Sequence, residues 1–81
     1  KKFEKQIDVC HDIVHQLKTG QDNIFGLMIE SHLVEGRQDQ VTGQTLTYGQ
    51  SITDGCIGWD ASASLLHELA QAVREKRTRA K

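Results

Sequence analysis

Glu30 is the residue whose position in the sequence most clearly suggests chemistry. It ends the apolar run "IFGLMI" (24–29), and His32 follows two residues later. Side chains alternate along a strand, so Glu30 and His32 would point the same way if the strand continued that far. A carboxylate in apolar surroundings is costly unless a positive or hydrogen-bonding group compensates it. A divalent metal, a substrate cation, an arginine or a backbone amide would each do so, and spacing alone leaves these alternatives open.

A second acid, Asp54, lies in "SITDGC" (51–56), directly before Gly55. We expect Gly55 to allow a tight backbone turn after this acid. Two acids 24 residues apart are a weak signal, because metal sites need more ligands than two. On spacing alone, Asp54 is better explained as a turn residue or a helix cap than as a metal ligand.

Three other features are weaker candidates for a site. His11 and His15 are four residues apart, but the glutamate that follows the first histidine in zinc proteases is missing, so we interpret both as surface residues. Cys10 lies beside His11, and Cys56 is most simply a small buried residue. The basic end "REKRTRAK" (74–81) favours a solvated helix end over a nucleic-acid contact.

Length and charge exclude several classes of protein. The 81 residues allow one small domain at most, and the net charge of -1 gives no electrostatic reason to bind nucleic acid or an anionic membrane. No apolar run approaches the roughly 20 residues that a membrane span needs. Two cysteines are too few for a disulfide framework, so we expect free thiols and a cytoplasmic location.

The candidate residues must be positioned by a short set of elements. Residues 1–18 and 60–77 are predicted to be amphipathic helices, with apolar residues every three or four positions. The predicted apolar stripes are Phe3, Ile7, Cys10, Ile13, Val14 and Leu17 in the first helix, and Leu65, Leu66, Leu69 and Val73 in the second.

Residues 24–29 have the length of a strand and lack the alternation of a solvent-facing one. This pattern is typical of a strand buried on both faces, as in parallel sheets of α/β folds. The intervening residues 31–59 contain five glycines, and a small hairpin around Gly43 is possible there. No convincing second strand is available for residues 24–29, so we expect the chain to be one part of a larger α/β protein whose other strands precede Lys1.

Two sequence blocks resemble a known family. The blocks "MIESHLVEGRQ" (28–38) and "SITDGCIGW" (51–59) resemble the C-terminal end of class I 3-deoxy-D-arabino-heptulosonate 7-phosphate (DAHP) synthase. The stretch "KKFEKQIDVCHDIV" (1–14) resembles the helix that precedes them in that family. The resemblance covers essentially the whole chain, and the order and spacing of the blocks match.

The resemblance implies a fold. Residues 1–81 would be the C-terminal quarter of a single (β/α)8 TIM barrel domain, a fragment and not a complete domain. Residues 1–18 would be its seventh helix, 24–30 its eighth strand and 60–77 its eighth helix. Residues 31–59 would be the long active-site loop after that strand.

The resemblance also implies an activity. Members condense phosphoenolpyruvate with erythrose 4-phosphate, giving DAHP and phosphate, at the first step of the shikimate pathway to aromatic amino acids. They need a divalent metal ion, Mn²⁺, Fe²⁺, Co²⁺ or Zn²⁺, held by a cysteine, a histidine, a glutamate and an aspartate. The last two map onto Glu30 and Asp54, which would be metal ligands and catalytic residues, with Asp54 also close to the tetrose hydroxyls. The other two ligands would lie upstream of Lys1.

On this interpretation the full-length protein is a cytoplasmic homo-oligomer that binds neither nucleic acid nor membrane, and the isolated chain is inactive. The first alternative is a free-standing helical interaction module, in which the two helices pack together or on a partner. It would depend on Ile7, Val14, Leu66 and Leu69 and not on either acid. The second alternative is a barrel with a different chemistry.

Overall fold

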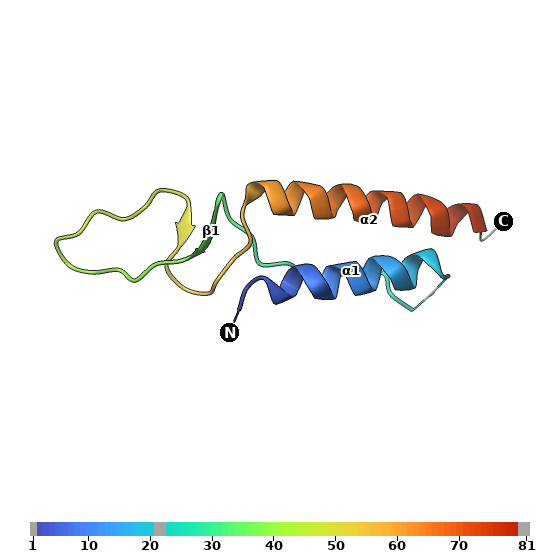
Figure 1. The fold of residues 1–81 in the computed structure, drawn as a ribbon, viewed down its shortest axis with the longest axis horizontal. Helices are drawn as coiled ribbons and strands as arrows, with labels where there is room; N and C mark the ends of the chain where they lie inside the picture. Colours follow the sequence, from blue (N-terminus) through green and yellow to red (C-terminus); the bar gives the residue numbers. More distant parts are fainter. Residues whose placement is uncertain (1, 21–22, 80–81) are drawn as a thin grey trace.

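The structure is a computed structural model, and it describes residues 2–20 and 23–79. Its elements are α1 (Lys5–Lys18), β1 (Val34–Arg37), β2 (Gln50–Ser51) and α2 (Trp59–Arg79). The two helices lie side by side and both begin at the end where the loop between them projects (Figure 1). Both predicted helices are formed, but their bounds differ from the prediction: α1 begins at Lys5, so residues 2–4 are not helical, and α2 extends one residue earlier and two residues later than 60–77. Lys1 lies outside the described residues.

The end of α1 follows from local geometry. The backbone N–H of Thr19 donates to the carbonyl of His15 at 3.1 Å, and that of Gly20 donates to the carbonyl of Leu17 at 3.1 Å. Gly20 has a φ of +95°, a conformation that costs a residue with a Cβ far more than glycine. The helix therefore ends where the sequence predicts.

The core forms where α1 meets α2. One buried cluster contains Cys10, Ile57 and Leu65, and a second contains Val14, Leu17 and Ala72. The prediction of Leu66 as a core residue is wrong, because its side chain is 63% exposed, whereas Ala72 is fully buried. Successive residues are about 100° apart around a helix, so Leu65 faces α1 and its neighbour Leu66 turns away.

Two polar contacts between α1 and α2 flank this core on the same edge of the helix pair. His11 Nε2 lies 3.4 Å from Glu68 Oε2, and Lys18 Nζ lies 3.7 Å from Glu75 Oε2. The partners are seven residues apart on each helix, so the two pairs lie two turns apart. All four side chains are well exposed to solvent, so each pair contributes at most about 1 kcal/mol and mainly favours one helix register.

The strand predicted at 24–30 is not formed. Residues 24–30 belong to neither helix nor strand, and the backbone of residues 24–29 makes no hydrogen bond with another described residue. The side chains of Phe25 and Met28 are 100% and 81% exposed. The prediction fails because a strand needs a neighbouring strand, and the described part of the chain supplies none beside residues 24–29.

The small sheet lies in the loop instead. Strands β1 and β2 pair in parallel, with Val34 opposite Gln50 and Arg37 opposite Ser51. The hairpin predicted around Gly43 is not formed: residues 41–44 make a single turn, and Gly43 takes a φ of +85° within it. Neither described helix is long and apolar enough to cross a membrane.

Replacing Leu65 by alanine tests how the helices pack. We expect Leu65→Ala to lower the free energy of unfolding by about 2–5 kcal/mol, because its side chain fills the core between the helices. Leu66→Ala is the matched control and should change it by no more than about 0.5 kcal/mol. Urea unfolding of the chain, followed by circular dichroism, measures both. Equal effects would contradict this packing.

Candidate active site

Glu30 is placed by a short stretch of parallel pairing with the far end of the loop. The backbone N–H of Ile57 donates to the carbonyl of Glu30 at 3.0 Å, and that of His32 donates to the carbonyl of Ile57 at 3.0 Å. Ser31 is thereby paired with Ile57 in a parallel bridge. The pairing brings Glu30 beside the segment that contains Asp54, although the two acids are 24 residues apart in sequence.

Helix α1 supplies a second backbone contact to Glu30. The backbone N–H of Glu30 donates to Gln6 Oε1 at 2.7 Å, and Gln6 Nε2 donates to the carbonyl of Glu30 at 3.2 Å. The first turn of α1 therefore lies directly beside the end of the apolar run.

The two predicted acids line one pocket of about 280 Å³. Glu30 is half-buried and Asp54 is exposed. Neither carboxylate makes a hydrogen bond or ion pair with another described residue. The lining residues are Lys2, Phe3, Gln6, Glu30, Asp54 and Gly55. Carboxylate oxygens are ligands that divalent cations bind, so two carboxylates at one pocket can contribute to a cation site. Lys2 is the one basic residue that lines this pocket among the described residues.

The segment before Asp54 is held by side chains of the loop. Arg37 Nε donates to the carbonyl of Thr53 at 2.8 Å, while the same guanidinium pairs with Asp39 at 2.8 Å. The backbone N–H of Thr53 donates to Ser51 Oγ at 3.1 Å. These contacts fix the backbone immediately before Asp54.

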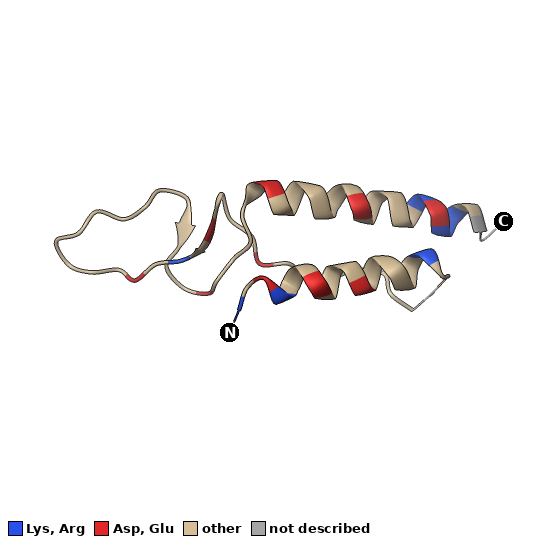
Figure 2. Ribbon diagram, in the orientation of Figure 1, with Lys and Arg blue, Asp and Glu red and all other residues tan. Residues whose placement is uncertain are grey.

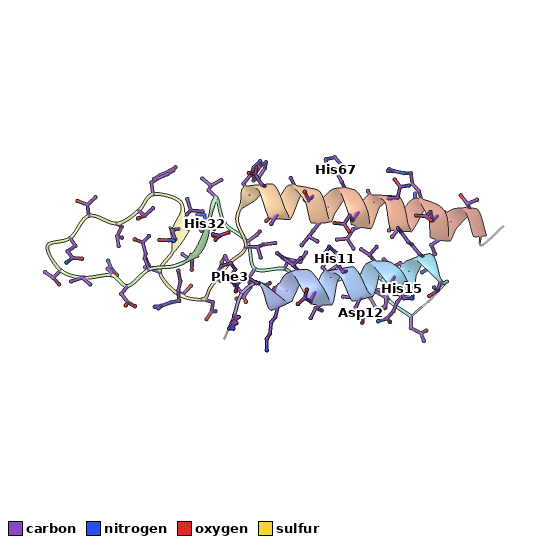
Figure 3. All side chains as sticks on the ribbon, viewed as in Figure 1. Phe3, His11, Asp12, His15, His32 and His67 are labelled. Atoms are coloured by element: carbon purple, nitrogen blue, oxygen red, sulfur yellow. The ribbon has the colours of Figure 1, made fainter. Side chains whose placement is uncertain are left out.

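Gly55 acts by close approach and not by an unusual turn. Gly55 is not part of a turn, and its φ lies outside the positive range that four other glycines of the chain adopt, so the expected role in a tight turn is wrong. A Cβ placed on Gly55 would lie 3.3 Å from Cβ of Phe3. Phe3 lies just before α1, beside the loop (Figure 3). The absence of a side chain at Gly55 allows the loop to pack on the segment that leads into α1.

Comparisons with known proteins show the family of the chain. Residues 1–67 match the DAHP synthetase I family. The chain belongs to the DAHP synthetase I family. The phospho-2-dehydro-3-deoxyheptonate aldolase of Haemophilus influenzae is 57% identical over 77 residues, which are 95% of this chain and 21% of that protein. The Phe-sensitive phospho-2-dehydro-3-deoxyheptonate aldolase of Escherichia coli K12 is 52% identical over 95% of this chain and 22% of its own length.

A solved structure shows the same arrangement. The phospho-2-dehydro-3-deoxyheptonate aldolase of Francisella tularensis SCHU S4 superposes with a TM-score of 0.85 at 45% identity, over 93% of this chain and 21% of that one. The chain thus spans about a fifth of the length of these relatives. The resemblance carried by the two sequence blocks is confirmed at the level of the family, and the mixed α/β character is confirmed with it.

None of the four histidines of this DAHP synthetase I family member lines the pocket of the two acids. His32 does not line their pocket; its Nδ1 accepts a hydrogen bond from the backbone N–H of Leu33 at 2.8 Å. His11 lies on the side of α1 that faces α2, where it contacts Glu68, while His67 projects from the far side of α2 (Figure 3). Among residues 2–20 and 23–79, no three His, Cys, Asp or Glu residues are grouped to hold a metal ion.

The basic segment forms the C-terminal end of α2, as predicted. Lysine and arginine gather near its C-terminal end, where cations interact favourably with the helix dipole (Figure 2). Residues 80–81 of this segment lie outside the described residues. Cys56 is buried as predicted, and both cysteines are free thiols.

Cys10 is protected by its position in the core. Burial, followed by the nearby Glu68 carboxylate, raises the pKa of the Cys10 thiol above its ordinary value of 9.0. A raised pKa in the folded state means that the neutral thiol contributes stability below pH 9, and that this contribution is lost as the pH rises through the folded value. Cys10 is therefore an unreactive core residue.

The pH dependence of stability tests this assignment. The free energy of unfolding should fall as the pH rises from about 8 to about 10, because the unfolded chain then releases the Cys10 proton more readily than the folded one. Cys10→Ala should be less stable at pH 8 but should lose less of its remaining stability over that interval. Urea titrations at each pH measure both proteins. Parallel pH profiles would contradict the raised pKa.

Proposed function

We propose that this chain supplies part of the active site of a phospho-2-dehydro-3-deoxyheptonate aldolase. The reaction condenses phosphoenolpyruvate with erythrose 4-phosphate and releases phosphate, in the shikimate pathway to aromatic amino acids. One observation carries the proposal: Glu30 and Asp54, one from each of the two family-like sequence blocks, line the same pocket. The names of the relatives and the family match support it.

The unpaired segment before Glu30 supports a barrel. Residues 24–29 leave apolar side chains exposed and backbone groups without partners among the described residues. Flanking strands of a longer polypeptide would satisfy both, because each backbone group left unpaired in a buried strand costs about 1–3 kcal/mol. We therefore propose that residues 24–30 are the eighth strand of a (β/α)8 barrel. Helices α1 and α2 would then be its seventh and eighth helices.

The donor set fits half of a metal site. Carboxylate oxygens bind divalent cations, and Glu30 and Asp54 face the pocket without another described partner. We propose that they would hold Mn²⁺, Fe²⁺, Co²⁺ or Zn²⁺ together with a cysteine and a histidine from outside this chain. When bound, such an ion supplies Lewis-acid polarisation of a substrate carbonyl.

The two acids differ in what their own side chains can do. Glu30 is half-buried and its backbone is fixed on two sides, so it can hold a charge at a constant place. Asp54 is an exposed loop residue that lines the pocket, so its carboxylate can accept a hydrogen bond from a substrate hydroxyl. The chain alone supplies two of four proposed ligands and is expected to be inactive.

The proposed location is the cytoplasm, where cysteines stay reduced. The free thiols of Cys10 and Cys56 are consistent with it.

Conservative removal of each charge tests the proposal in the longer polypeptide that contains this chain. Glu30→Gln and Asp54→Asn should each weaken Mn²⁺ binding by at least about tenfold and lower kcat, because each removes a proposed ligand. Glu35→Gln is the matched control, since Glu35 is an exposed acid outside the pocket. Metal titration and phosphate release measure the effects. Unchanged metal binding in Glu30→Gln would refute the ligand assignment.

A further inference from the structure

One side chain on α1 binds both backbone groups of Glu30. Gln6 Oε1 accepts from the backbone N–H at 2.7 Å, and Gln6 Nε2 donates to the carbonyl oxygen at 3.2 Å. The N–H and C=O of one residue in an extended chain point to the same side, so a single carboxamide can reach both. The contact closes a ring of two hydrogen bonds, like that between paired residues of antiparallel strands.

The contact lies on the edge of the chain that also pairs with the loop. The carbonyl of Glu30 accepts from the backbone N–H of Ile57 as well as from Gln6 Nε2. Gln6 and Ile57 thus bind the same edge of the extended segment. Gln6 takes the place that a neighbouring strand would occupy beside Glu30. Both ends of the Glu30 backbone unit are held, and the direction of its Cα–Cβ bond is fixed with them.

Glutamine is suited to this contact by its chemistry. Its carboxamide carries an acceptor and a donor side by side, whereas glutamate has no donor when ionised and methionine has no comparable polar groups. Gln6 is half-buried and lines the pocket of the two acids, and Phe3, one turn earlier, packs against Gly55. The first turn of α1 and the residues just before it therefore both line the pocket.

We propose that Gln6 is a positioning residue for Glu30, holding the backbone so that the carboxylate stays directed at the pocket shared with Asp54. The inference rests on the proposed function, in which Glu30 is a metal ligand. Metal sites tolerate little displacement of a ligand, and loss of a supporting contact typically weakens binding by about 10–100-fold. Gln6 acts through Glu30 and does not itself bind metal or substrate.

The test compares two identical substitutions on α1 in the longer polypeptide. Gln6→Met removes both hydrogen bonds to Glu30 and keeps the side-chain length. Gln16→Met is the matched control, because Gln16 Nε2 bonds to Asp12 Oδ2 at 2.8 Å, within the same helix. We expect Gln6→Met to weaken Mn²⁺ binding to the metal-free protein by roughly tenfold or more, and Gln16→Met to leave it unchanged.

Two further readouts separate positioning from general stability. Amide hydrogen exchange at Glu30 should become faster in Gln6→Met, since its N–H loses the carboxamide acceptor. In the Glu30→Gln background, Gln6→Met should cause no further loss of Mn²⁺ affinity, because the ligand it positions is already gone. Additive losses would overturn the proposal.

The outcomes distinguish this inference from the proposed function. Normal Mn²⁺ affinity in Gln6→Met, with weakened binding in Glu30→Gln, would overturn the role of Gln6 and retain the function. Normal affinity in Glu30→Gln would overturn the function itself, and the role of Gln6 with it. If Gln6→Met does not fold, Gln6→Asn keeps a polar side chain too short to make both contacts. Unchanged Mn²⁺ affinity in that variant would overturn the role equally.

Discussion

The pairing of Glu30 and His32 with Ile57 joins the candidate site to the core between the helices. Its two backbone hydrogen bonds join the end of the apolar run to the far end of the loop. The side chain of Ile57, 1% exposed, packs with Cys10 and Leu65 in the helix core. Burial of such a side chain contributes about 1.5–3 kcal/mol. One residue therefore connects the packing of the helices to the position of the candidate site.

Glutamine side chains form hydrogen bonds with backbone N–H and C=O groups where the strands are too short to do so. Gln38 Nε2 donates to the carbonyls of Thr47 and Gln50, and Gln38 Oε1 accepts from the N–H of Thr47, so one carboxamide closes the projecting part of the loop. Gln50 Nε2 donates to the carbonyl of Glu35. Gln6 likewise binds the backbone N–H and carbonyl of Glu30. A long loop with little secondary structure is held in one conformation by these side-chain contacts.

Periodicity predicted the helices well and the strand poorly, for a physical reason. The three-four spacing of Cys10, Val14 and Leu17 describes a helix face that α2 covers within the chain. Residues 24–29 carry the pattern of a buried strand, but the chain holds no neighbour for it among the described residues. Leu66 was misassigned because adjacent leucines leave the centre of a stripe ambiguous, and the small buried Ala72 adds little to such a pattern.

The site was predictable only in part. Glu30 was proposed from its place at the end of the apolar run, whereas its pairing with Asp54 was proposed only from the family-like blocks, since a separation of 24 residues says nothing about distance in space. Gln6 could not have been identified, because a glutamine near the start of an amphipathic helix reads as solvent-facing. Its proposed role depends on hydrogen bonds to the backbone of Glu30, and neither residue type nor spacing predicts such bonds.

Anomalous diffraction from crystals of the longer polypeptide loaded with Zn²⁺ would test whether Glu30 and Asp54 bind a metal ion. If they do, we expect one strong anomalous peak in the pocket, about 2.0–2.2 Å from a carboxylate oxygen of Glu30 and from one of Asp54. A peak that contacts neither acid, with both carboxylates engaged by arginine or lysine side chains, would contradict this assignment.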